Sequence, residues 1–283
     1  QRFGLLYDPR SKAERGDLLA EGVNAAQARK ACGPIFAKSA TALEAFAAVV
    51  DECLAQITRN AIGLCDGDPT LAAEHVHQLR VGIRRLRSAL KCFKGWAPPA
   101  PPNLIEGLRV LFAGLGACRD TDVLSSGVLA DLARAGAPPM AMQGAENGAS
   151  PVDLIRSDST QRMLLAWIAW RESLAHGEVD PPPVADTTSG EHGAAAPLGE
   201  SAPKFSRLVD RRLCRWHALF ATDWDEFDQL DEERLHDLRK RIKRQRYGAE
   251  FFAPVLRRKQ LDHYIGVLSV IQDRMGELND LFV

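Results

Sequence analysis

HVHQLRVGIRRLRSALKCF, residues 75–93, is the stretch that decides the fold. On an α-helix each residue turns by about 100°, so the apolar side chains of this stretch gather on one face. They are Val76, Leu79, Ile83, Leu86, Leu90 and Phe93. An apolar stripe of this kind predicts a helix that packs one side against a hydrophobic core.

A second stripe on the same helix is basic and lies directly beside the apolar one. We call it the first basic stripe, and it comprises His77, Arg80, Arg84, Arg87 and Lys91. Neighbouring like charges on a helix repel, and charges at the edge of a buried face cannot simply point away from the protein. The line of cations therefore indicates a function for these side chains.

Composition limits where an anion site can be. The 283 residues are 46% hydrophobic and 26% charged, which is ordinary for a soluble globular protein. Because the net charge is -1, any anion site must be a local concentration of positive charge. No apolar run approaches the roughly 20 residues that span a bilayer, so we expect a cytoplasmic protein without a membrane segment.

The six cysteines are scattered and include no C-x-x-C pair. They are Cys32, Cys53, Cys65, Cys92, Cys118 and Cys214. We interpret them as free, mostly buried thiols of a reducing compartment.

Apolar periodicity predicts an all-α protein, since no Val/Ile/Thr run alternates with period two. The expected helices cover residues 39–64, 70–95, 104–115, 120–135, 154–175, 205–220, 231–252 and 257–283. Residues 1–36 are expected to form a weakly ordered lead-in with a short helix near 18–30. The Ala/Gly/Pro-rich residues 136–150 and the Pro- and Gly-rich residues 177–203 are predicted to be flexible linkers.

The basic helix has a second copy in LHDLRKRIKRQRYGAEFF, residues 235–252. An offset of 236 − 77 = 159 aligns four of its residues with residues of the first basic stripe. We call them the second basic stripe: His236, Arg239, Lys243 and Arg246. The counterpart of Lys91 is Glu250, so the second copy is expected to be less positive at that end.

A second motif recurs in the same order. LGACRD, residues 115–120, aligns with MGELND, residues 275–280, at an offset of 280 − 120 = 160. The two matches predict a tandem duplication with repeats at about 37–135 and 154–283, joined through flexible residues 136–153. If the repeats pack about a pseudo-twofold axis, the two basic stripes face each other across a positively lined channel. Their mutual repulsion favours an anionic polymer between them.

These motifs resemble the CHAD family, the conserved-histidine α-helical domain. HQLRVGIRRLR, residues 77–87, and LGACRD fit the family signature, whereas the second copy is looser, with Lys240 in place of Val and Asn279 where Arg119 stands. The resemblance covers residues 37–283. It implies an all-α fold of two helical bundles around a basic central channel that binds inorganic polyphosphate, and some members are found on polyphosphate granules.

The resemblance implies that the polyphosphate-binding residues are those of the two stripes together with Arg119. His77 and His236 have two interpretations, either core histidines or donors to phosphate at the channel mouth. Arg119 is equally open, since it can pair with Asp122 or point into the channel. Asp120 and Asp280 are interpreted as helix caps or as partners that orient stripe arginines. No histidine spacing indicates a metal site, and no cofactor is expected.

Three other functions are compatible with parts of the sequence. Residues 11–16, SKAERG, look like the tail of a triphosphate-hydrolysing CYTH domain, so this chain could be the accessory half of such an enzyme. The metal-binding Glu-x-Glu-x-Lys strand of that family is absent, which favours binding without catalysis. Nucleic acid is a less favoured ligand because no aromatic residues interleave with the stripes. A scaffold that docks acidic proteins is the third alternative.

Overall fold

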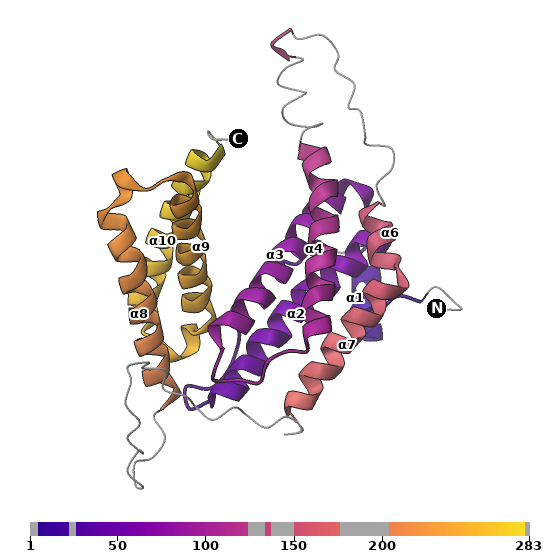
Figure 1. Ribbon diagram of the computed structural model, residues 1–283. Coiled ribbons are helices and arrows are strands. Elements are labelled where there is room, and N and C mark those ends of the chain that lie inside the picture. The colour runs from indigo at the N-terminus through magenta and orange to yellow at the C-terminus, as the bar shows by residue number, and fades with distance from the viewer. Residues whose placement is uncertain (1–4, 23–26, 124–133, 137–149, 176–203, 281–283) are drawn as a thin grey trace. The chain divides into compact units, whose positions relative to one another are not determined.

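The computed structural model describes residues 5–22, 27–123, 134–136, 150–175 and 204–280 (Figure 1). The side chains of residues 118–123, 225 and 277–280 are outside the description. Within these ranges the protein is all-α, as predicted, and its only β feature is an isolated bridge between Lys94 and Ala97. The helices are α1 (Lys12–Ala20), α2 (Ala42–Asp66), α3 (Ala72–Cys92), α4 (Pro102–Val123), α6 (Pro151–Arg156), α7 (Asp158–Ala175), α8 (Phe205–Asp225), α9 (Glu232–Phe251) and α10 (Arg258–Asp280).

Three predicted boundaries were wrong. The first helix lies earlier than residues 18–30, because Ser11 caps it by accepting a hydrogen bond from the Glu14 N–H (3.0 Å). The expected break between residues 115 and 120 does not occur, and α4 continues to Val123. The single helix expected over 154–175 is two helices, because Ser157 interrupts it and its hydroxyl accepts from the Thr160 N–H (3.3 Å). The linkers predicted at 136–150 and 177–203 fall almost entirely outside the described residues.

One compact unit, unit 1, contains residues 1–32, 51–87 and 100–176. In it α4, α6 and α7 pack against one another (Figure 1). Described parts of the N-terminal lead-in are hydrogen-bonded to this unit, since the Tyr7 N–H donates to Gln161 (2.9 Å) and the Arg29 N–H to Asn60 (3.1 Å). Backbone N–H groups of the lead-in thus satisfy the buried side chains of Gln161 and Asn60, which the composition of the lead-in did not predict.

Helices α2 and α3 pack tightly at small and polar residues. Gln56 donates to Gln78 across this seam (3.1 Å), and a Cβ added at Gly82 would lie 2.9 Å from the Ile57 side chain. His75 is completely buried and is hydrogen-bonded through Nδ1 to Asn60 (3.1 Å). The buried histidine of this helix is thus His75, which does not belong to the first basic stripe.

The other unit, unit 2, contains residues 33–50, 88–99 and 177–283. Helices α8 and α10 both pack on α9. Part of its core consists of Phe220, Leu238, Ile242, Leu268 and Met275. Further aromatic packing joins Phe93, Trp96, Phe205 and Phe252, with Phe93 and Phe252 ring centroids 5.1 Å apart. The start of α2 and the end of α3 belong to unit 2, whereas the rest of these two helices belongs to unit 1.

Burial follows the same spacing as the sequence motifs. The order long helix, 3-10 turn, long helix occurs in α2, η1 (Pro69–Leu71) and α3, and again in α8, η4 (Phe227–Gln229) and α9. Phe46 and Val50 are buried on α2, and Phe205 and Val209, each 159 residues later, are buried on α8. The offset of the basic stripes therefore extends to core positions of the preceding helix.

The described cysteines are free thiols, as expected, but fewer are buried than predicted. Cys53 and Cys92 are buried and Cys65 is partly so, whereas Cys32 and Cys214 are exposed, and the Cys118 side chain is outside the description. Burial raises the pKa of the Cys53 thiol to about 12, which makes it unreactive. In the described part of the chain, no helix combines the length and apolarity that crossing a bilayer requires.

Candidate functional site

The two stripes of helix α3 differ in how deeply their side chains are buried. Val76, Leu79, Ile83, Leu86 and Phe93 are buried as predicted, whereas Leu90 is only partly buried. In the first basic stripe His77, Arg80, Arg84 and Arg87 are partly buried and Lys91 is exposed. The arginines thus lie at the edge of the core, where Nε and Nη1 of Arg80 and Nε of Arg84 are buried.

Helix α4 supports two arginines of the first stripe. The Arg80 guanidinium lies over the Phe112 ring, 4.6 Å from its centroid, and the Arg87 guanidinium lies 5.9 Å from the same centroid. Stacking on an aromatic face holds a guanidinium without neutralising it. Arg80 also lies against Gly116, where an added Cβ would come within 2.6 Å of Nη1. The Gly of the LGACRD motif therefore makes room for the guanidinium of the first motif.

We expect Gly116→Ala to displace the Arg80 guanidinium while the fold persists, because the clash is with the tip of a flexible side chain. The matched control is Gly276→Ala, whose added Cβ would lie 3.5 Å from Arg239 Nη2, an ordinary contact. Anion affinity measured by titration should fall about threefold to tenfold in Gly116→Ala, because a displaced guanidinium loses only part of the about 1.5–3 kcal/mol that a charged hydrogen bond contributes. It should stay within about twofold in Gly276→Ala. Equal affinities in the two variants would contradict this role for Gly116.

The second basic stripe lies on α9. His236 is exposed, whereas Arg239, Lys243 and Arg246 are partly buried. Arg239 contacts Gly276 of α10, and its buried Nε has no hydrogen-bond partner among the described residues. Arg246 donates from Nε to Gln272 (3.0 Å) and from Nη1 to Glu250 (2.6 Å). The positive charge of Arg246 is thus partly neutralised by the Glu250 carboxylate of the same helix.

The two stripes differ at their C-terminal ends. Gln272 stands 160 residues after Phe112, so an amide accepts a hydrogen bond in the place where an aromatic ring supports Arg87 in the first copy. Glu250 pairs with Arg246, whereas its counterpart Lys91 is an exposed cation. This agrees with the expectation that the second copy is less positive at this end.

The consecutive arginines of the motif have separate roles. Arg85 follows Arg84 but is buried, and its Nη2 donates to the Cys32 carbonyl (2.7 Å). Arg244, its counterpart, lies over the Trp216 ring, 4.8 Å from the centroid, and burial lowers its pKa. Neither belongs to a basic stripe. Both anchor their helix instead.

Several predicted residues cannot be placed, and others were missed. The side chains of Arg119, Asp120 and Asp280 lie outside the described residues.

The sequence did not predict roles for Phe112 and Gln272. Their position one turn before each glycine motif was the available signal. Where side chains are described, no group of three His, Cys, Asp or Glu residues could hold a metal ion.

These features define an all-α protein that carries two arginine-rich helix faces, each with a glycine of a neighbouring helix against one of its arginines. The sequence model of the CHAD domain matches residues 48–283, well over half of the chain. The chain therefore belongs to the CHAD domain family. It is also similar to the crystal structure of the CHAD domain from the plant Ricinus communis, with 27% identity, a TM-score of 0.67, and coverage of 91% of this chain and 81% of that one. A search of curated proteins found no match.

Proposed function

We propose that the protein binds inorganic polyphosphate through the two basic stripes and does not hydrolyse it. The proposal rests on the contacts of Arg80 and Arg87 with α4, which hold two guanidinium groups against the Phe112 ring at the edge of the core. Guanidinium groups bind phosphate oxygens in a two-pronged fashion, and lysine adds a mobile point charge. Membership of the CHAD family supports the same ligand.

We further propose that the chain is a tandem duplication whose stripes line one basic channel. The shared offset of the motifs and the recurrence of buried positions 159 residues apart support the duplication. A linear polyphosphate has about one charge per phosphate and no bases, so a channel needs cations and no base-reading groups. Binding of linear polyphosphate would localise the protein to polyphosphate granules in the cytoplasm.

A competition titration tests the proposed ligand. Labelled single-stranded DNA is bound to the protein at low salt, and long-chain polyphosphate or unlabelled DNA is added in increasing amounts, with both concentrations expressed per phosphate. We expect polyphosphate to displace the label at a concentration at least about tenfold lower. Affinity should also fall as salt rises, by analogy with the counter-ion release of nucleic acids. Stronger displacement by DNA would make nucleic acid the ligand.

A phosphate-release assay tests the absence of catalysis. Purified protein is incubated with tripolyphosphate and Mg²⁺ or Mn²⁺, and free phosphate is measured over time. We expect no release above the rate without protein, because the described residues contain no cluster that could hold a catalytic metal. Metal-dependent release would assign this chain to a triphosphate-hydrolysing enzyme.

Replacing Glu250 with Gln is expected to strengthen polyphosphate binding about threefold to tenfold. The Glu250 carboxylate pairs with Arg246 and competes with phosphate for it, and a pair in this partly exposed setting contributes about 1 kcal/mol. The matched control is Asp237→Asn, because Asp237 pairs with Lys240, a residue of the same helix outside the stripe. Titration should show no gain in the control. An equal gain in both would mean that net charge alone is responsible.

A further inference from the structure

Arg87 and Arg246 hold the same motif position in the two stripes, 159 residues apart, but their surroundings differ. The Arg87 guanidinium lies against the Phe112 ring, 5.9 Å from the centroid, and forms no ion pair with a residue that the structure describes. The Arg246 guanidinium donates to the Glu250 carboxylate (2.6 Å) and to Gln272 (3.0 Å). A phosphate therefore meets no competing carboxylate at Arg87 and meets one at Arg246.

The ion pair of Arg246 with Glu250 lies in a partly shielded place. The two side chains are 24% and 19% exposed, so water weakens their attraction less than it weakens that of a fully exposed pair. The Arg246 guanidinium also lies over the Tyr247 ring, 4.9 Å from the centroid. Phosphate binding at this arginine must therefore displace the carboxylate or bear its repulsion.

Arg80 and Arg239, the next pair of counterparts, differ in how firmly they are held. The Arg80 guanidinium lies 4.6 Å from the centroid of the Phe112 ring, and a Cβ added at Gly116 would be 2.6 Å from its Nη1. At Gly276 the corresponding distance to Arg239 is 3.5 Å, and no aromatic ring that the structure describes lies under this guanidinium. Groups held in place before binding cost less to order when the ligand arrives.

We propose that the two stripes are half-sites of unequal strength, and that the first stripe alone binds a short condensed phosphate such as tripolyphosphate. This rests on the proposed function and adds the class of ligand that one stripe can hold. A longer chain that is held by the first stripe raises the local concentration of phosphate at the second and so overcomes Glu250. The arginines and lysine of each half-site belong to one unit, Arg80, Arg84 and Arg87 to unit 1 and Arg239, Lys243 and Arg246 to unit 2.

Exchanging the charges that differ between the two copies tests the inequality. Lys91 and Glu250 are counterparts, and each follows its stripe arginine by four residues, so a glutamate at position 91 can pair with Arg87. Tripolyphosphate is titrated without divalent metal by isothermal titration calorimetry, and one molecule should bind the unchanged chain. Lys91→Glu should weaken that site at least about tenfold, because it reverses one charge and adds a competing carboxylate. Glu250→Lys should add a second site.

The double variant Lys91→Glu/Glu250→Lys has the net charge of the unchanged chain, so it separates position from charge. One tripolyphosphate should still bind, but on the second stripe. Adding Lys243→Glu should then weaken binding at least about tenfold, whereas in the unchanged chain Arg84→Glu should have this effect on tripolyphosphate and Lys243→Glu should not. A polyphosphate long enough to reach both stripes should lose affinity with either change.

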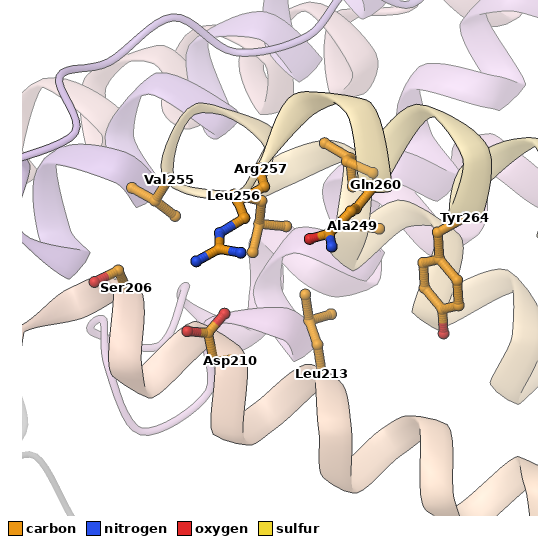
Figure 2. A pocket seen from close by; sticks show the side chains of 10 residues that line it. Ser206, Asp210, Leu213, Ala249, Val255, Leu256, Arg257, Gln260 and Tyr264 are labelled. Atoms are coloured by element: carbon orange, nitrogen blue, oxygen red, sulfur yellow. The ribbon is translucent and has the colours of Figure 1, made fainter.

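A groove of about 520 Å³ between α8 and α10 supplies the control in unit 2 (Figure 2). Arg257 lines it together with the Asp210 carboxylate, and no residue of the second stripe lines it. Arg257→Glu makes the same change of charge as Lys243→Glu. In the double variant it should leave tripolyphosphate affinity within about twofold, and loss of binding would place the anion in the groove and overturn the assignment.

The outcomes separate this inference from the proposed function. Two equal tripolyphosphate sites in the unchanged chain, or equal losses in Arg84→Glu and Lys243→Glu, would overturn the inference and leave polyphosphate binding intact. Binding of long-chain polyphosphate without binding of tripolyphosphate would overturn it as well. Failure of both ligands to bind would contradict the proposed function itself. Circular dichroism of each variant checks that the fold is intact.

Discussion

Reversing one charge in each stripe, in the double variant Arg84→Glu/Lys243→Glu, is expected to weaken polyphosphate binding at least about a hundredfold. Two reversals change four units of charge, and each unit contributes about 1 kcal/mol at about 4 Å even in water. Tenfold in affinity corresponds to about 1.4 kcal/mol. Both side chains lie partly buried on their stripes, so their charges act at the surface where we propose that the ligand binds.

The control for this variant has the same net charge. Arg162 and Arg258 are exposed, and each pairs with an acidic residue one turn away on its own helix. Surface pairs of this kind contribute little to stability, so Arg162→Glu/Arg258→Glu should fold normally. Titration with long-chain polyphosphate at about 0.15 M salt should give an affinity within about threefold of the unchanged protein, because distant charges are screened. Equal affinity in the stripe variant and the unchanged protein would exclude the stripes as the site.

Gly63→Ala is expected to lower the free energy of unfolding by about 2 kcal/mol. An added Cβ would lie 2.3 Å from Cε1 of His75 and 2.9 Å from both ring nitrogens. His75 is fully buried and bonded to Asn60, so its ring has no space into which it can move. Overpacking a core costs about 1–3 kcal/mol, and loss of the hydrogen bond adds about 1 kcal/mol, while the better helix propensity of Ala returns about 1 kcal/mol.

Gly266→Ala on α10 is the control for Gly63→Ala. Nothing lies within 4 Å of the added Cβ at Gly266, so only the gain in helix propensity remains. Urea unfolding followed by circular dichroism should show a lower midpoint for Gly63→Ala and an unchanged or higher midpoint for Gly266→Ala. A stable Gly63→Ala protein would mean that the His75 pocket is not tightly packed.

The helices with a strong apolar period were predictable from the sequence. Helices α3 and α9 lie close to their expected ranges because one face of each is buried and the other is charged. Boundaries that depend on one side chain were not predictable. The Ser157 interruption rests on a local hydrogen bond, and the continuation of α4 places Gly116 inside a helix, where it packs against Arg80.

Side-chain roles were predictable only to the level of a helix face. His75 and His77 are two residues apart on the same helix. That His75 is the buried one depends on the space left by Gly63 of another helix, which the sequence pattern does not indicate. The support of Arg80 by Phe112 joins residues on different helices and likewise depends on tertiary packing. By contrast, the difference between Lys91 and Glu250 was visible in the aligned motifs, and the structure adds that Glu250 pairs with Arg246.

The most direct test of the central claim is the stoichiometry of binding, measured by isothermal titration calorimetry with a short polyphosphate of defined length. If both stripes bind the same polymer, one class of site should appear with one polyphosphate per protein, and Arg84→Glu and Lys243→Glu should each weaken that single site. Two independent sites per protein, each abolished by only one of these substitutions, would contradict a shared channel.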